Sequence, residues 1–181
     1  MLLLYKSYVR SIVEYCCPLW SPHLQSDIIT VEGVQRSFTS KIQGHHNLNY
    51  WERLKILNLY SLQRRRERYS IILVWKILNN LIPNCINISF NESARRGTSC
   101  IRPLGNSKYS SINTMIFNSF SSVAPALFNA VPAHIKSIPT LTSFKAALDK
   151  WLKSFPDTPP TPGYLGVNKN SLLEWTSSKC Q

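Results

Sequence analysis

The sequence predicts a mainly α-helical protein, on three observations. Apolar residues recur at three- and four-residue spacing in several stretches, which is the period of an amphipathic helix. Proline, glycine and small polar residues stand between these stretches, as they do where helices begin and end. Residues 84–111 and the Pro-rich end lack that period, so the loops should be confined to them. We expect a small helical bundle, then a loop-rich basic segment holding at most one or two short strands, then one or two further helices.

The composition also predicts where the chain divides. Its 181 residues suffice for one modest domain or two small ones. Residues 1–82 should form a bundle of four helices, and residues 83–155 combine the basic loop with a C-terminal helical region. Residues 156–181 begin with a cluster of prolines and end in polar residues, so we expect a disordered Pro-rich tail there.

Two amphipathic helices are predicted before residue 45. Apolar residues at helical spacing define the first, over residues 2–16, and the next two prolines end it. This helix begins without a polar capping residue, so we expect the gene or the gene model to be truncated. Ser26 or Asp27 caps the second helix, and Gly44 ends it. The predicted apolar face of the second helix consists of Ile28, Val31, Val34, Phe38 and Ile42.

A short third helix should run from Tyr50 to Leu57, before the longest helix of the chain. Ser61 caps this longest helix, which reaches about Asn80. Its first half is basic and should be exposed. Its second half, from Tyr69 to Leu81, is apolar nearly all round and should be buried.

Helical spacing returns after the loop-rich segment. One stretch begins at Ile112, where Pro125 favours a break. Pro139 and Thr140 introduce a final helix. The apolar stripe of this final helix consists of Leu141, Phe144, Leu148, Trp151, Leu152 and Phe155.

Positive charge dominates the chain and is concentrated in one part of it. The 21 Lys and Arg against 9 Asp and Glu give a formal net charge of +12. Between Arg53 and Lys108 there are eleven Lys or Arg and only two acids. Such a concentration attracts phosphate backbones or anionic surfaces. A basic surface with no dedicated partner is the alternative.

The apolar runs and the cysteines indicate the cellular compartment in which the protein resides. The longest uncharged apolar run, Ile71 to Trp75, is far too short to span a bilayer, and the first residues do not form a secretion signal. The five cysteines are odd in number and irregularly spaced. We therefore expect reduced thiols in a cytoplasmic or nuclear protein that has no membrane partner.

An arginine cluster stands inside the longest predicted helix, with four arginines in five positions. At about 100° per residue, Arg64, Arg65 and Arg68 share one arc, whereas Arg66 points toward an apolar stripe. Three guanidinium groups on an open arc suit contact with successive phosphates. Contact with the acids of a partner protein, and an idle solvated face, are the alternatives.

A second basic segment supplies further candidates for nucleic-acid binding. Arg95, Arg96 and Arg102 stand among Ser and Asn, as in a loop, and form a second set for phosphate contact. Trp51 and Tyr109 are candidates for base stacking, although packing is the commoner role of such aromatic residues.

The acids and the thiols do not predict a catalytic centre. Nucleotidyl transfer by two metal ions needs gathered carboxylates, whereas the three aspartates, Asp27, Asp149 and Asp157, each stand alone. The adjacent pairs Cys16–Cys17 and His45–His46 lack the spacing of zinc ligands. Cys16 is better explained as a core residue, and nothing selects a Cys–His nucleophile pair. We expect no catalytic residue, no metal and no cofactor.

Segments spread over residues 2–153 carry a family resemblance. Residues 4–22 read Leu-Tyr-Lys-Ser-Tyr-Val-Arg-Ser-Ile-Val-Glu-Tyr-Cys-Cys-Pro-Leu-Trp-Ser-Pro. This segment resembles the one that follows the polymerase palm in reverse transcriptases of non-LTR retrotransposons, especially the jockey-like group. Phe128 and Val131 stand where that family has Trp and Leu, which are changes in packing. Further matching segments are Val34–Arg36, Glu52–Leu54, Leu59–Leu62, Arg64–Arg66, Lys76–Asn79, Phe117–Pro132 and Ser143–Lys145.

The resemblance implies the thumb and C-terminal region of such a polymerase, without fingers, palm or endonuclease. In that family this region grips template RNA and primer. We therefore expect residues 1–82 to be a thumb-like domain, and the chain to bind RNA or an RNA–DNA hybrid without sequence specificity. The palm of the parent RNA-directed DNA polymerase would be its other partner.

Two rival functions stay open. Without a palm, the face of the first helix that carries Leu2, Tyr5 and Val9 would be exposed, and the chain would then be a protein-interaction module able to self-associate. A decayed retrotransposon, whose product has no role, is the other rival.

Overall fold

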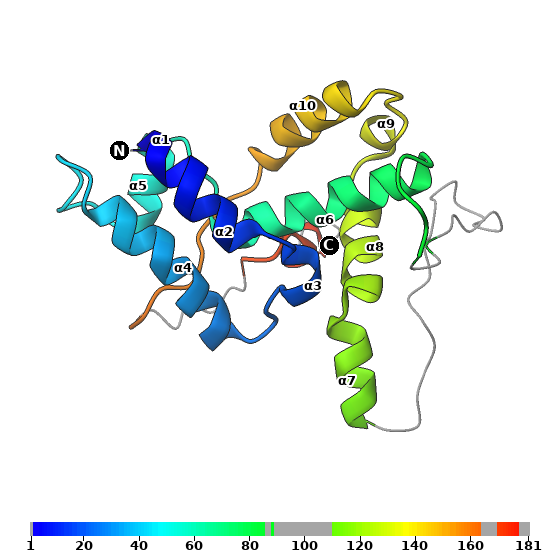
Figure 1. The fold of residues 1–181 in the computed structure, drawn as a ribbon, viewed down its shortest axis with the longest axis horizontal. Coiled ribbons are helices and arrows are strands. Elements are labelled where there is room, and N and C mark those ends of the chain that lie inside the picture. The colour runs from blue at the N-terminus through cyan, green and yellow to red at the C-terminus, as the bar shows by residue number, and fades with distance from the viewer. Residues whose placement is uncertain (1, 86–87, 89–109, 164–169, 178–181) are drawn as a thin grey trace. The chain divides into compact units, whose positions relative to one another are not determined.

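The structure is a computed structural model that describes residues 2–85, 88, 110–163 and 170–177, and it is mainly helical as predicted (Figure 1). Those residues contain no β-strand. The chain divides into two compact units. The first comprises Met1–Arg66 and Pro156–Glu174, and the second comprises Glu67–Phe155 and Trp175–Gln181. This division differs from the predicted one at residue 82, because α6 (Leu62–Leu78) runs from the first unit into the second.

The first unit contains the N-terminal helices. In chain order they are α1 (Leu2–Leu4), the π-helical turn η1 (Tyr5–Val9), α2 (Arg10–Glu14), α3 (Cys17–Trp20), α4 (Gln25–Ser40), α5 (Tyr50–Ile56) and the beginning of α6. The first three follow one another without a break and form the predicted first helix. The capping position of α4 is Leu24, not Ser26 or Asp27 as predicted. Gly44 has a left-handed φ of 82° and lies beyond the end of α4.

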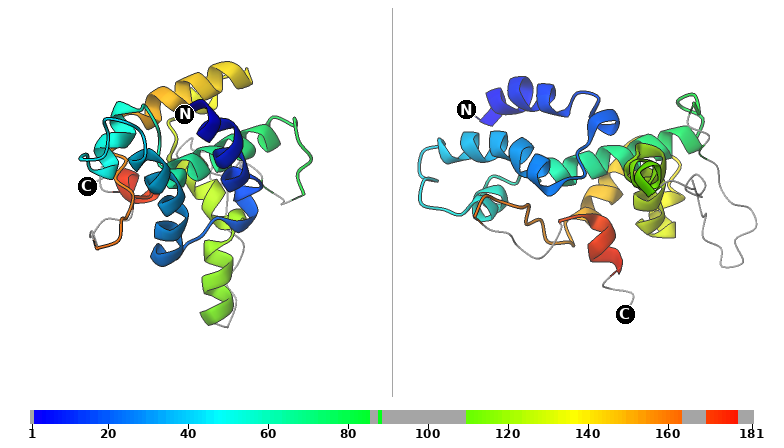
Figure 2. Two further views of the ribbon diagram at one scale, coloured as in Figure 1. Left: turned by 60° about the vertical axis from the view of Figure 1, so that its left-hand side comes forward. Right: turned by 90° about the horizontal axis from the view of Figure 1, so that it is seen from below.

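The first helix buries the side that was expected to be exposed. Tyr5 is only 1% exposed, and its ring stacks on Phe38 of α4 with 4.5 Å between the centroids. The views in Figures 1 and 2 show this helix running alongside α4. Leu4, Tyr8 and Ile12 remain exposed. The predicted exposure of the Leu2–Tyr5–Val9 face is therefore wrong, and a different apolar face of the same helix reaches solvent.

Helix α4 buries polar side chains in place of the predicted apolar stripe. Glu32, Gln35 and Thr39 are completely buried. A hydrogen-bond chain satisfies Gln35 and Glu32: Tyr5 Oη donates to Gln35 Oε1 (2.8 Å), Gln35 Nε2 to Tyr50 Oη (3.1 Å), and Tyr50 Oη to Glu32 Oε2 (2.7 Å). Thr39 Oγ1 donates to the carbonyl oxygen of Arg36 (3.1 Å). Buried polar groups are tolerated when they are paired in this way. The predicted stripe is only half-buried or exposed, at Ile28, Val31, Val34, Phe38 and Ile42.

The beginnings of α5 and α6 agree with the sequence. Asn49 and Glu52 form a capping box at the start of α5, in which Asn49 N donates to Glu52 Oε2 (2.9 Å). Ser61 caps α6, since its Oγ accepts a hydrogen bond from Arg64 N (3.0 Å). Local capping chemistry therefore sets both boundaries.

Two carboxylates from distant parts of the chain also bind the N-terminus of α6. Asp157 accepts a hydrogen bond from Ser61 N, and Glu32 accepts one from Gln63 N, each at 2.7 Å. The first amide groups of a helix have no helical partner and carry a partial positive charge. These two acids therefore stabilise the start of α6 and connect it to α4 and to the C-terminal segment.

The prediction of a disordered tail is wrong for its described part. Trp51 Nε1 donates to the carbonyl oxygen of Pro159 (2.9 Å), and Pro159 and Pro160 are buried. Asn170 is 1% exposed, and its Nδ2 donates to Asp157 Oδ1 (2.7 Å). A last helix, α11 (Leu172–Ser177), follows. Backbone and amide contacts hold this Pro-rich segment, and such contacts leave no periodicity in the sequence.

The second unit is built on the rest of α6. It contains α7 (Ser110–Asn118), α8 (Phe120–Ala130), α9 (Ala133–Lys136) and α10 (Leu141–Leu152). The predicted burial of the second half of α6 is confirmed for Ser70–Ile72, Val74, Trp75 and Ile77, whereas Leu81, beyond the end of the helix, is 59% exposed. Trp75 stacks on Phe144 of α10 with 4.9 Å between the centroids. The predicted stripe of α10 is confirmed at Phe144, Leu148 and Leu152.

The break predicted near Pro125 lies earlier in the chain. Ser119 separates α7 from α8, and Pro125 is buried inside α8. The hydroxyl groups of Ser119 and Ser122 both donate to the carbonyl oxygen of Ile116 (2.6 and 2.7 Å), which satisfies an end carbonyl of α7. Most of the predicted loop-rich segment, residues 86–87 and 89–109, lies outside the described residues.

Candidate nucleic-acid interface

Arg64 is the most buried member of the arginine cluster, at 1% exposed. Its Nη2 donates to the carbonyl oxygens of Pro156 (2.8 Å) and Asn170 (3.4 Å). Within the described ranges, no carboxylate forms a salt bridge with it. Arg64 therefore holds the C-terminal segment against α6 and does not face solvent.

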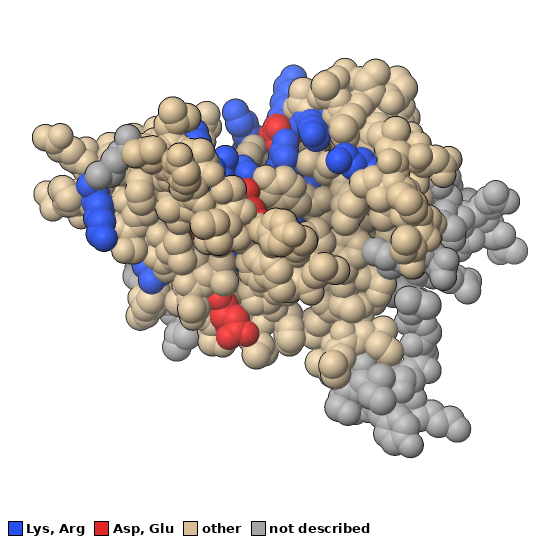
Figure 3. All heavy atoms as spheres, viewed as in Figure 1, with Lys and Arg blue, Asp and Glu red and all other residues tan. Residues whose placement is uncertain are grey.

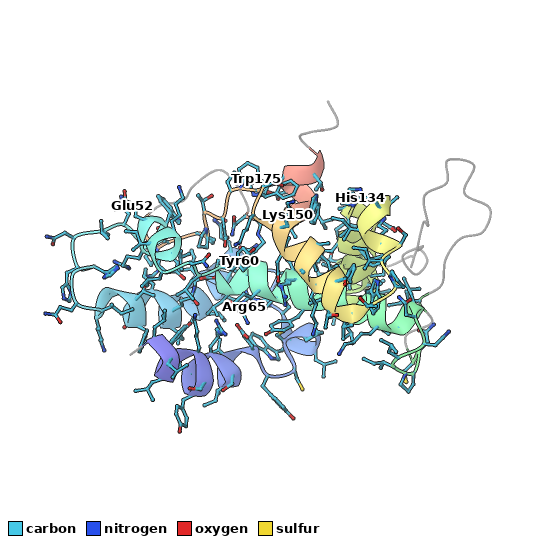
Figure 4. The ribbon with its side chains drawn as sticks, turned by 90° about the horizontal axis from the view of Figure 1, so that it is seen from above. Glu52, Tyr60, Arg65, His134, Lys150 and Trp175 are labelled. Atoms are coloured by element: carbon cyan, nitrogen blue, oxygen red, sulfur yellow. The ribbon has the colours of Figure 1, made fainter. Side chains whose placement is uncertain are left out.

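Arg65 and Arg66 also contact the first unit. Arg65 forms a two-point pair with Glu14, from Nε to Oε1 and from Nη2 to Oε2 (2.9 Å). Arg66 is 3% exposed, and its guanidinium carbon lies 6.0 Å from the centroid of the Trp20 ring, at cation–π distance. The predicted inward orientation of Arg66 is confirmed. Figure 4 shows Arg65 on α6.

Arg68 belongs to the second unit and binds α10. Its Nη2 donates to Asp149 Oδ2 (2.8 Å), and its Nε donates to Asp149 Oδ1. The side chains are partly exposed, at 16% for Arg68 and 35% for Asp149. This pair fixes α10 against α6.

The predicted open arc of guanidinium groups is therefore wrong. Arg64, Arg65 and Arg68 bind backbone carbonyls, Glu14 and Asp149 respectively. Helical geometry placed them near one arc, but the sequence did not reveal which distant groups cover it. Their contact with phosphate is a prediction that these contacts do not support. The second set of candidates, Arg95, Arg96 and Arg102, lies outside the described residues.

Internal contacts engage several of the few carboxylates. Glu14 and Asp149 bind arginines, Glu32 and Asp157 bind amides at the start of α6, and Glu52 caps α5. On the face drawn in Figure 3, Lys and Arg atoms reach the surface at more places than Asp and Glu atoms. Acids that pair internally do not offset the remaining surface cations, so the outward field is positive.

A basic surface lies on α10 and its C-terminal capping residue, and we call it the α10 lysine face. It consists of Lys145, Lys150 and Lys153. At about 100° per residue they spread over an arc of about 140°, away from the buried Phe144 and Leu148. Lys150 and Lys153 are exposed, and Lys145 is half-buried. Figure 4 shows Lys150 on this helix.

Sequence reasoning missed the α10 lysine face because its lysines are not consecutive. Their separations of five and three residues were the available signal. Asp149 stands between them in the sequence, where it would offset their charge. Its pairing with Arg68 prevents that offset, and only the structure shows this pairing.

No metal site is present among the residues that the structure describes, since they contain no suitable group of three His, Cys, Asp or Glu. Cys16 is exposed with a left-handed φ of 49°, so its predicted core position is wrong. Its neighbour Cys17 is buried, and burial raises the pKa of that thiol to about 11. A thiol that stays protonated at neutral pH is a poor nucleophile and a poor metal ligand.

The structure describes one of the two aromatic candidates for base stacking. Trp51 is half-buried, and its indole N–H is engaged by Pro159, which fits packing and not base stacking. Tyr109 lies outside the described residues.

None of the helices in the described ranges has the length and apolar character needed to cross a bilayer.

Comparisons with protein-family models, with curated proteins and with solved structures each found no match for this chain. The resemblance to retrotransposon reverse transcriptases therefore rests on the order and spacing of its sequence segments.

Proposed function

We propose that this chain binds the phosphate backbone of RNA or an RNA–DNA hybrid without reading sequence, as a non-catalytic part of a retroelement reverse transcriptase. The net charge of +12 and the order of the segments support this role. The observation that carries it is the internal pairing of acids such as Glu14 and Asp149, which leaves exposed lysines uncompensated. Uncompensated cations bind phosphate backbones with little regard to sequence.

The α10 lysine face fits this role best in the described chain. Lysine is a point charge on a flexible stem, so it contacts phosphates without a fixed geometry. The Arg68–Asp149 pair anchors the helix that presents these lysines. In this proposal the arginines of α6 organise the fold, and the lysines contact the ligand.

Salt-dependent binding tests the proposal. Fluorescence anisotropy would follow a labelled RNA hairpin and an RNA–DNA hybrid at several salt concentrations. Replacing Lys145, Lys150 and Lys153 with Ala should weaken binding equally for unrelated sequences. The slope of log K against log salt should fall by about 2–3, since each phosphate contact contributes about 0.9.

The matched control removes exposed lysines of the first unit, Lys41→Ala with Lys55→Ala. It should change the slope less per lysine than the substitutions on α10. Equal effects per lysine would show that net charge alone matters, and would overturn the assignment to α10. No measurable binding by the unmodified chain would overturn the function.

A protein-interaction module is the second candidate function. Large exposed apolar side chains on the first helix, Leu4, Tyr8 and Ile12, favour it. A chain that binds no nucleic acid but associates with protein would replace the first proposal with this one. A chain that does neither would favour a decayed element.

A further inference from the structure

The Pro-rich segment contains one short motif twice. Residues 156–162 read Pro-Asp-Thr-Pro-Pro-Thr-Pro, so Thr158 and Thr161 each have a proline directly after them and another two positions before them. Elsewhere in the chain, only Ser21 is a hydroxyl residue followed by proline, and it has Leu19 two positions before it. Proline has no backbone N–H, and kinases of the proline-directed class accept it in an apolar pocket directly after the hydroxyl residue. Both threonines therefore match the substrate pattern of that class.

Hydrogen bonds on both sides of Thr158 hold the first copy of the motif in place. Pro159, the proline that follows Thr158, is buried, and its carbonyl oxygen accepts a hydrogen bond from Trp51 Nε1 (2.9 Å). The carboxylate of Asp157, the residue before, accepts hydrogen bonds from Ser61 N and Ser61 Oγ, each at 2.7 Å. A kinase pocket cannot take the proline after Thr158 while these contacts last.

The backbone around Thr158 is engaged as well. The N–H of Thr158 donates to Asn170 Oδ1 (2.9 Å), and Arg64 Nη2 donates to the carbonyl oxygen of Pro156 (2.8 Å). The side chain of Thr158 is nevertheless exposed. Exposure of the side chain would therefore select Thr158, whereas the state of its backbone and of the next proline excludes it.

The second copy of the motif extends beyond these contacts. Pro160 is buried and Thr161 is half-buried, but Pro162 and Gly163 are exposed. The proline after Thr161 is therefore available to a kinase pocket in the folded chain, and the proline after Thr158 is not. The two copies have the same sequence pattern and differ in what the fold does with them.

We propose that Thr161 is the phosphoryl acceptor of an ATP-dependent, proline-directed kinase, and that the contacts around Thr158 exclude the same reaction there. Thr161 Oγ1 forms a bond to the γ-phosphorus of ATP, and the bond from that phosphorus to the β–γ bridging oxygen breaks. ADP leaves with the electron pair of that bond, and the hydroxyl proton passes to a carboxylate of the kinase. The product carries an added charge of about −1.5 to −2 at pH 7. This inference is independent of nucleic-acid binding.

Phosphorylation of the full chain tests the assignment. The chain would be incubated with ATP and a purified proline-directed kinase, and tandem mass spectrometry would locate and quantify the phosphate over time. Thr161 should react at least about tenfold faster than Thr158, since several hydrogen bonds oppose the opening that Thr158 needs. Thr161→Ala should remove most of the incorporation. Thr158→Ala makes the same change in the same motif and should leave it unchanged.

A synthetic peptide of residues 154–163 separates the fold from the sequence. No tertiary contact holds this peptide, so its two threonines should react at similar rates. The peptide also verifies that the kinase is active on this motif. A preference for Thr161 in the peptide equal to that in the full chain would overturn the role of the contacts around Thr158.

Trp51→Phe tests the same contacts from outside the motif. It keeps an aromatic ring and removes the indole N–H that binds Pro159. The rate at Thr158 should rise about fivefold, the effect of one hydrogen bond on the population of the open segment, and the rate at Thr161 should not change. Trp151→Phe makes the same change at a half-buried position of α10 and should alter neither rate. Circular dichroism checks that each variant folds.

Several outcomes would overturn the proposal. They are a full chain that takes no phosphate although the peptide does, equal rates at Thr158 and Thr161 in the full chain, and phosphate on Ser21 alone. An unchanged rate at Thr158 in Trp51→Phe would overturn the part of the proposal that concerns Thr158.

Discussion

Arg64 and Trp75 lie on the same helix and are equally inaccessible, each 1% exposed, but different forces hold them. Arg64 Nη2 donates to backbone carbonyls of the C-terminal segment. Trp75 is enclosed by apolar side chains and stacks on Phe144. The first half of α6 is thus buried through directed polar contacts, and the second half through apolar packing.

This difference indicates which changes should lower the stability of each half of α6. Apolar burial is non-directional and tolerates small shifts. Polar burial depends on every partner being in place, because an unpaired buried group is costly. We therefore expect large losses of stability where apolar packing is removed from α6, and dependence on pH and on particular partners in its polar half.

The largest effect is expected from Trp75→Ala in the apolar half. Removing this buried ring should lower the free energy of unfolding by about 3–5 kcal/mol, as for other large-to-small core substitutions. Urea denaturation followed by circular dichroism measures this. Trp75→Phe is the matched control: it keeps most of the packing and removes an indole N–H that has no hydrogen-bond partner in the described chain. A loss of less than about 1 kcal/mol in the Ala variant would contradict the comparison.

The polar half should show a dependence on pH through Glu32. Burial raises the pKa of Glu32 from 4.5 to about 7, and the charge of Asp157 contributes to this increase. Hydrogen bonds from Tyr50 and Gln63 and the charge of Arg66 act in the opposite direction and lower the pKa. Between these two values the folded chain binds a proton that the unfolded chain releases. The free energy of unfolding should therefore decrease as the pH rises through this window, by about 3 kcal/mol in total.

Glu32→Gln tests this dependence. The variant should lose most of the decrease between pH 4.5 and 7, measured by urea denaturation at several pH values. Asp27→Asn makes the same change of charge at an exposed position of α4 and should keep the decrease. An unchanged pH profile in Glu32→Gln would show that its carboxyl group is not the source.

A moderate effect is expected from Arg64→Met, which keeps much of the side-chain volume. It should lower the free energy of unfolding by about 1–3 kcal/mol, because the carbonyl groups of Pro156 and Asn170 lose a charged donor. Limited proteolysis should then cleave the C-terminal segment faster. Lys150→Met removes the same charge from an exposed position and should change stability by less than about 0.5 kcal/mol.

Arg64→Met also tests whether Arg64 contributes to the stability of the fold or to the binding of RNA. If α6 organises the structure and α10 contacts the ligand, the variant should keep the salt dependence of RNA binding at temperatures where it is folded. A loss of salt dependence equal to that of the α10 substitutions would indicate that Arg64 itself contacts the RNA.

The sequence predicted what depends on neighbouring residues and missed what depends on distant ones. The helical class, the Ser61 cap and the apolar stripe of α10 follow from local chemistry and were correct. Glu32 and Arg64 are buried against partners that are 18 to 106 residues distant in the sequence. The helical period of the sequence gives no information on such contacts.

The candidate site was predicted poorly for the same reason. A run of arginines indicates positive charge, but the carbonyl groups and acids that engage it come from elsewhere in the chain. The lysines of α10 were visible in the sequence. Their importance depends on the pairing of Asp149 with Arg68, which is a tertiary contact.

The smallest change in stability, and the sharpest test of the α10 lysine face, is expected from Asp149→Asn. The pair with Arg68 is partly exposed, so its loss should cost no more than about 1 kcal/mol. RNA affinity should increase, because Arg68 is released and a negative charge leaves the lysine face; the salt slope should rise by up to about 1. Asp27→Asn on α4 is the control and should have a smaller effect. If Asp149→Asn left the affinity unchanged, α10 would be a solvated helix face and the phosphate contacts would have to come from another part of the chain.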